Sequence, residues 1–160
     1  RKRARFLSLQ LNSTDPNKPE EMQKITSLLL NNPVNTYITP PFFCDYGYNI
    51  ELEENVYFNF NCIVLDVTKV KIGANTLFAP GVHIYTATHP IDSKERVSGI
   101  EYGKPVTIGK NVWVGGGSII CPGVTIGDNV VIGAGSVVTK DLPACVLAAG
   151  NPCKIIREIS

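Results

Sequence analysis

The chain has 160 residues, 44% of them hydrophobic, and a formal net charge of +1 at pH 7. This length predicts one domain with a sizeable core, and the near-neutral charge argues against nucleic acid or a membrane surface as the main partner. Charge is uneven only at the start, where positions 1, 2, 3 and 5 are basic, and such a run is usually a solvated face.

No apolar run reaches the roughly 18 residues that a transmembrane helix needs. No apolar core follows the first basic residues, as it would in a signal peptide. The cysteines are odd in number and form no C-x-x-C pair, which predicts reduced thiols in place of a disulfide framework or a zinc site. They are Cys44, Cys62, Cys121, Cys145 and Cys153. We therefore expect a cytoplasmic protein that holds no metal ion.

Residues 1–35 are expected to form a helical cap. Helices are predicted over 4–11 and 20–31. The second presents one apolar face, made of Met22, Ile25, Leu28 and Leu29. Pro19 lies near its start, as a helix N-terminus prefers. Because the sequence opens on Arg1 and not on Met, we expect the cap to begin before Arg1.

A six-residue repeat occupies most of the remaining chain. From residue 106 the sequence reads VTIGKN, VWVGGG, SIICPG, VTIGDN, VVIGAG and SVVTKD. The third position of each hexad is aliphatic, at Ile108, Val114, Ile120, Ile126, Ile132 and Val138. The same spacing recurs upstream at Ile72, Phe78 and Ile84, and more loosely at Leu52, Phe58 and Val64. A period of six fits neither a helix nor a long ordinary strand, but it fits a short strand and a corner, repeated.

Three such sides would close a triangular turn, with stacked turns about 4.8 Å apart. The aliphatic column would then form one continuous core. The repeat predicts a mainly β fold, a parallel β-helix over 36–160, whose hand the periodicity does not set. We expect about four coils, at 50–67, 70–85, 106–121 and 124–139. The stretch 145–160 is expected to leave the repeat as a short basic helix or tail.

The segment 86–105 interrupts the repeat and is rich in polar and turn-forming residues. We expect an exposed loop, and loops of this length without secondary structure are uncommon unless they are functional. The segment contains His89, one of two histidines, and histidine is the side chain that changes its charge near neutral pH. The other, His83, alternates with the inward Val82 and Ile84 and should point outward.

Hexads of the form I-G-x-N-V-x resemble those of the hexapeptide-repeat acyltransferases, whose coil is left-handed. Further segments resemble the maltose and galactoside O-acetyltransferases: FCDYG at 43–47, NFN at 59–61, TATHP at 86–90, GIEYGKP at 99–105 and GNP at 150–152. The C-D-Y-G form is that of the maltose type. The resemblance covers essentially the whole chain. It implies a left-handed parallel β-helix that moves the acetyl group of acetyl-coenzyme A to a sugar hydroxyl, as a homotrimer with active sites between subunits.

The resemblance also implies roles for particular residues. His89 would be the general base that a weakly nucleophilic hydroxyl requires, and Asn59 would lie near the acyl group or the base. The backbone N–H of Gly116 would meet the thioester oxygen, at a position where galactoside enzymes carry Ser. Trp113 would line the pantetheine groove. The other coenzyme A contacts would be Ala134, Thr139, Lys140, Lys154 and Arg157.

For the acceptor, the carboxylates of Asp45 and Asp66 are the candidates to pair with sugar hydroxyls. Val67 stands where galactoside enzymes have a second aspartate that contacts sugar. Glu101 is expected either to orient His89 or to touch the acceptor.

Other functions stay open on the same scaffold. One is acetyl transfer to serine or an amine, and another is a non-catalytic trimeric β-helix that serves as a binding module. The zinc-dependent carbonic anhydrases of this fold are disfavoured, because they look to three histidine ligands and this chain has two histidines.

Overall fold

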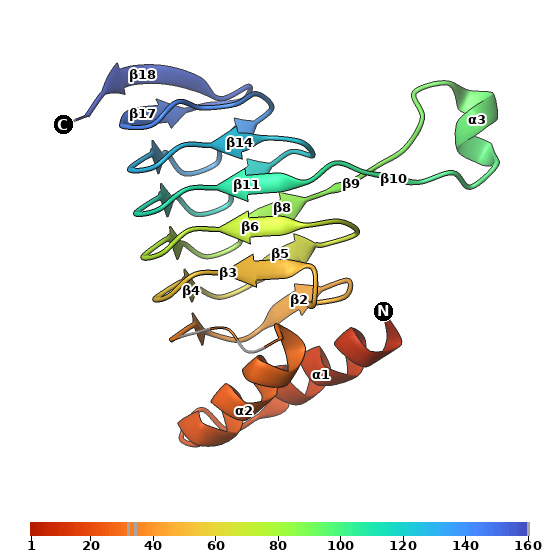
Figure 1. Ribbon diagram of the computed structural model, residues 1–160, viewed down its shortest axis with the longest axis vertical. Coiled ribbons are helices and arrows are strands. Elements are labelled where there is room, and N and C mark those ends of the chain that lie inside the picture. Colours follow the sequence, from red (N-terminus) through yellow and green to blue (C-terminus); the bar gives the residue numbers. More distant parts are fainter. Residues whose placement is uncertain (32, 34, 160) are drawn as a thin grey trace.

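The computed structural model describes residues 1–31, 33 and 35–159, and consists of a triangular β-helix standing on two helices (Figure 1). Helix α1 (Lys2–Ser13) and helix α2 (Pro19–Leu29) close one end of the prism, as predicted for the cap. Their buried faces centre on Leu7 and Leu11 of α1 and on Ile25 and Leu29 of α2. Leu28, expected on the buried face, is 50% exposed, and Leu30 is buried beyond the helix end. No helix in these described ranges is long and apolar enough to cross a bilayer.

Three sheets form the sides of the prism, and we call them faces A, B and C. Face A contains, in spatial order, β1 (Tyr37–Ile38), β4 (Tyr57–Phe58), β7 (Leu77–Phe78), β12 (Trp113–Val114), β15 (Val131–Ile132), β17 (Val146–Ala149) and β18 (Lys154–Glu158). Face B contains β2 (Phe42–Cys44), β5 (Cys62–Leu65), β8 (His83–Tyr85), β13 (Ile119–Ile120) and β16 (Val137–Val138). Face C contains β3 (Ile50–Leu52), β6 (Val70–Ile72), β11 (Val106–Ile108) and β14 (Thr125–Ile126).

The solenoid has about six turns, not the four that we predicted. The two additional turns lie at the ends, where the period departs from six. Ile38 pairs with Phe58, and Phe58 with Phe78, at intervals of 20 residues, whereas Val114 pairs with Ile132 at an interval of 18. The coils next to the helical cap therefore have longer corners, so a search at a fixed period does not detect them well.

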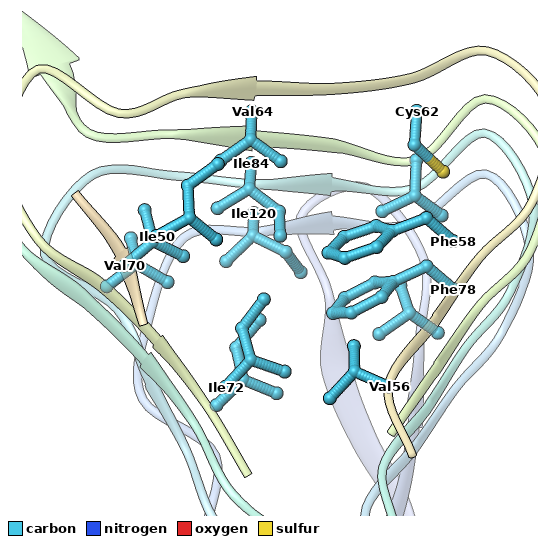
Figure 2. Packing of buried hydrophobic residues seen from close by; sticks show 14 of the residues in the cluster. Ile50, Val56, Phe58, Cys62, Val64, Val70, Ile72, Phe78, Ile84 and Ile120 are labelled. Carbon is cyan, nitrogen blue, oxygen red and sulfur yellow. The ribbon is translucent and has the colours of Figure 1, made fainter. Parts of the chain in front are cut away.

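The inward side chains of successive coils stack into one core (Figure 2). Phe58 lies on Phe78 with ring centroids 4.7 Å apart and 7° between the ring planes. The corners between faces C and A are held by a ladder of asparagine side-chain amides, all at residues with positive φ, a conformation that asparagine tolerates. The ladder runs through Asn55, Asn75, Asn111 and Asn129.

The segment 86–105 projects from the prism as an arm with its own secondary structure, not as an irregular loop (Figure 1). Strand β9 (Ala87–Thr88) pairs antiparallel with β10 (Tyr102–Gly103), and the short helix α3 (Ser93–Val97) lies between them. Asp92 caps α3 by accepting the backbone N–H groups of Lys94 and Glu95.

The end of the chain also differs from the predicted basic helix or tail, because Lys154–Glu158 is strand β18, antiparallel to β17. Without it, the backbone groups of β17 would form an open sheet edge, which proteins usually cover.

Candidate active site

The strands of face B run parallel, so every corner before them shares one edge of the prism and every corner after them shares another. We call these edge AB and edge BC. Edge AB is built from the corners at 39–41, 59–61, 79–81, 115–117 and 133–135. Edge BC is built from 45–49, 66–69, the arm at 86–105, 121–124 and 139–141. Most candidate site residues lie at one of these two edges, and Trp113, Lys154 and Arg157 lie on strands of face A.

His89 follows β9 on the arm, and its ring is exposed. Its Nδ1 atom lies 2.9 Å from the carbonyl oxygen of Ile100, on the opposite side of the arm. A carbonyl oxygen can only accept a hydrogen bond, so Nδ1 carries the proton and donates. Nε2 of the neutral ring is then left with a free lone pair, which is the tautomer that a proton acceptor requires.

Glu101 contacts Arg1 and not His89. Arg1 Nη2 donates to Glu101 Oε2 at 3.1 Å, and Arg1 Nε lies 3.4 Å from Asp45 Oδ1. The pKa of the Arg1 guanidinium is raised, mainly by the charge of Asp45 and then by the hydrogen bond to Glu101. Of the two roles expected for Glu101, orientation of His89 belongs instead to the neighbouring carbonyl of Ile100. Glu101 is joined to Asp45 through Arg1.

Asp66 lies beneath this surface and is 0% exposed. Its Oδ1 accepts the backbone N–H groups of Asp45 at 2.9 Å and Tyr46 at 2.8 Å, and its own carbonyl accepts the side-chain amide of Asn49. Burial raises the pKa of Asp66, although the backbone N–H groups work in the opposite direction. This placement differs from the expected contact with a sugar. Asp66 holds the segment 45–49 from below, and Asp45 is the carboxylate at the surface.

Edge AB brings Asn59, Gly116 and Ala134 into one column, although the three are far apart in sequence. The Oδ1 atom of Asn59 accepts the N–H of Phe60 at 2.8 Å. The N–H of Gly116 makes no hydrogen bond within the described parts of the chain, so it remains a free donor at the corner. Ala134 occupies the corner of the next coil, close enough that a Cβ on Gly115 would lie 2.5 Å from its nitrogen.

Trp113 lies on the outer side of face A, next to edge AB, and is 55% exposed. Val112 and Val114 on either side are buried, as the repeat predicted. The remaining residues expected to contact coenzyme A are exposed but lie in two places. Thr139 and Lys140 follow β16 at edge BC, whereas Lys154 and Arg157 lie on β18 of face A.

The two edges do not meet within one chain. Strand β5 crosses face B from Asn61 to Asp66, five residue steps or about 16 Å at roughly 3.3 Å per residue. His89 therefore shares edge BC with Asp45, Glu101 and Lys140, and it is separated by the width of a face from Asn59.

Sequence reasoning missed three features of this region. The first is the hydrogen bond between His89 and the carbonyl of Ile100, because a backbone group cannot be recognised from the residue type. The bridging position of Arg1 depends on how the cap meets edge BC. The burial of Asp66 did have a signal, because Cys62, Val64 and Asp66 follow the period of two that sends alternate residues inward.

Comparison with known proteins agrees with this architecture. A family model described as bacterial transferase hexapeptide (six repeats) matches residues 105–140. The galactoside O-acetyltransferase of Escherichia coli strain K12 is 44% identical over 161 residues, covering 100% of this chain and 79% of that protein. Three other relatives, 57–60% identical, are matched over 62–65% of their own length.

Two solved structures are similar over the whole chain. The crystal structure of a maltose O-acetyltransferase from Clostridium difficile 630 has 52% identity and a TM-score of 0.98, covering 100% of this chain and 86% of that one. A galactoside acetyltransferase in complex with coenzyme A has 43% identity and a TM-score of 0.97, covering 100% of this chain and 80% of that one.

These likenesses, together with the coil of hexads and the histidine-bearing arm, define a hexapeptide-repeat acetyltransferase, which confirms the fold and family predicted from the sequence. Within that class, this chain belongs to the galactoside and maltose O-acetyltransferases.

Proposed function

We propose that this acetyltransferase moves the acetyl group of acetyl-coenzyme A to a hydroxyl of a sugar such as maltose or glucose, with His89 as the general base. The observation that carries the proposal is the hydrogen bond from His89 Nδ1 to the carbonyl of Ile100, which leaves Nε2 free to accept a proton. The names of the relatives support a sugar as the acceptor.

In the proposed reaction, His89 Nε2 accepts the proton of the attacking hydroxyl while the hydroxyl oxygen bonds to the thioester carbonyl carbon. The N–H of Gly116 donates to the oxyanion that develops on the carbonyl oxygen. Asn59, in the same column, would help to hold the acyl group. When the carbon–sulfur bond breaks, His89 returns the proton to the leaving sulfur, so that the ring ends neutral.

This chemistry requires two copies of the chain, because His89 and Gly116 lie at opposite edges of face B. We propose a homotrimer in which edge BC of one copy meets edge AB of the next. The outer surfaces support this arrangement. Faces A and B present exposed apolar side chains such as Leu77 and Phe43, whereas face C presents charges, with Glu51 bound to Lys69.

Coenzyme A would be held by exposed groups on face A and at the two edges. Lys140, Lys154 and Arg157 form no ion pair within the part of the chain that the structure describes. Cations that lack an internal partner suit the phosphates of the coenzyme. Trp113 offers an exposed ring to the pantetheine chain, and Ala134 and Thr139 line its path at the corners.

The test is release of free coenzyme A from acetyl-coenzyme A over a panel of sugars, serine and an aminoglycoside. His89→Ala should lower sugar-dependent release by about two orders of magnitude or more, the usual contribution of a general base. The matched control is His83→Ala, which removes the other histidine, and both variants should keep the thermal stability of the parent.

Each outcome decides one part of the proposal. Release that survives His89→Ala would remove His89 from the mechanism. Release with serine or the aminoglycoside, and with no sugar, would replace the acceptor while keeping the enzyme class. Tight binding of the coenzyme without release for any acceptor would favour a binding module.

A further inference from the structure

We propose that the acceptor site extends from Asp45 onto an aromatic platform formed by Tyr46 and Tyr48, which stacks against a second sugar ring. The enzyme would then prefer disaccharides and longer glycosides to single sugars. This inference rests on the proposed transfer to sugars, and it adds the subsite that sets the length of the acceptor.

The platform continues a row of side chains that begins at the arm. The antiparallel register of β9 and β10 pairs Thr88 with Tyr102, so that Glu101 lies across the ribbon from His89. Glu101 binds Arg1 at 3.1 Å, and Arg1 binds Asp45 at 3.4 Å. Figure 1 shows that the N-terminal end of α1, where Arg1 lies, is on the same side of the prism as the arm.

From Arg1 the row reaches two aromatic rings. The Arg1 guanidinium carbon lies 5.3 Å from the centroid of the Tyr46 ring, and the Tyr46 and Tyr48 centroids lie 5.4 Å apart with 49° between their planes. Each of these two separations is comparable to the width of one pyranose ring. A sugar held by Asp45 and Glu101 beside Tyr46 would therefore have its linked neighbour one step further along, beside Tyr48.

The tyrosines stand on a rigid segment. Asp66 binds the N–H groups of Asp45 and Tyr46 from below. Gly47 has φ 78°, and a Cβ at that position would lie 2.2 Å from the carbonyl oxygen of Leu29. The segment therefore has little freedom to rearrange, and a rigid platform loses little conformational entropy when a ligand binds.

Tyr48 is nevertheless 56% exposed. The Tyr48 hydroxyl forms no side-chain hydrogen bond within the described residues, so its ring and hydroxyl are available to a ligand, whereas the half-buried Tyr46 ring has the Arg1 guanidinium over it. An aromatic face carries negative potential, which attracts the polarised C–H groups on the face of a pyranose ring. Carboxylates and a guanidinium beside an aromatic face match a ligand with hydroxyls on its rim and C–H groups on its face. Serine, the non-sugar alternative, has no ring to stack on Tyr48.

The test compares acceptors that differ only in length: maltose against glucose, and lactose against galactose. Acetylation would be measured for the parent, Tyr48→Ala, Tyr48→Phe and the control Phe6→Ala, which removes an exposed ring on α1. Tyr48→Ala should lower kcat/KM about fivefold for the disaccharides, the size of an aromatic stacking contact, and less than about twofold for single sugars. Tyr48→Phe and Phe6→Ala should retain the preference of the parent.

Calorimetric binding of maltotriose and of glucose, without acetyl-coenzyme A, separates this inference from the proposed function. Tighter binding of maltotriose that disappears in Tyr48→Ala supports the platform even if no sugar is acetylated. Acetylation that is indifferent to acceptor length, or an equal loss for both lengths in Tyr48→Ala, overturns the platform and leaves the proposed function intact. An absence of both binding and acetylation for every sugar overturns both.

Discussion

The Oδ1 atom of Asp66 lies 2.9 Å from the backbone nitrogen of Asp45, so that one carboxylate, fully buried, fixes the segment that presents another at the surface. The two aspartates were equal candidates in the sequence. In the fold they are unequal, because one holds the backbone and the other remains available to a ligand.

The burial of Asp66 makes stability depend on pH. Because burial raises the pKa of Asp66 above the ordinary 3.8, the folded state favours its protonated form. That stabilisation is fully present below the unfolded pKa and is lost as pH rises through the folded pKa. We expect the melting temperature of the parent, relative to Asp66→Asn, to fall as pH is raised from 3.5 to 7. A difference that grows with pH would mean that the two N–H donors outweigh burial.

The tautomer of His89 can be measured directly. Nitrogen-15 NMR of a His83→Asn variant, which leaves one histidine, should find the neutral ring protonated at Nδ1, because the Ile100 carbonyl accepts that proton. A neutral ring protonated at Nε2 would leave the base without its lone pair at the exposed nitrogen and would contradict the proposed mechanism.

Two glycines with similar backbone conformations offer a matched pair. Gly47 has φ 78° and a would-be Cβ 2.2 Å from the Leu29 carbonyl oxygen, whereas Gly99 has φ 84° and open space around it. Gly99→Ala should cost about 1 kcal/mol, the strain of a left-handed alanine. Gly47→Ala should cost about 3 kcal/mol or more, since the clash with backbone adds to that strain. Urea unfolding measures both, and equal costs would show that the segment around Gly47 yields easily.

The cysteines should differ in reactivity. Burial raises the pKa of Cys44 to about 12 and of Cys62 to about 11, so neither forms an appreciable amount of the reactive thiolate at pH 8. Cys145 is exposed. Labelling of the native protein with a thiol reagent should therefore modify Cys145 first, and Cys145→Ser should remove that first phase. Fast labelling of Cys44 would mean that the contact between α1 and β2 opens readily.

The sequence was informative wherever a side chain follows the repeat. The inward column from Ile108 to Val138 and the outward Trp113 were predicted because a solenoid reuses one geometry, so each hexad repeats the evidence of the others. The arm was predicted as the one interruption of that geometry.

Features that depend on how distant segments meet could not be predicted. The interaction of Arg1 with Glu101 joins residues 100 positions apart, and neither residue type specifies the partner. The strand β18 was missed because its residues, all exposed, show no alternation. They pair because β17 offers an open edge at that place, which is a property of the fold and not of the segment.

The closing of both ends of the prism has a consequence for the molecule as a whole. A stack of coils is a template to which another stack can add, since each terminal coil presents the same backbone groups as the coils within. Helices α1 and α2 cover one end, and β18 covers β17 at the other (Figure 1). The ends of the stack therefore present fewer open strand edges than a bare stack of coils would, which works against end-to-end addition.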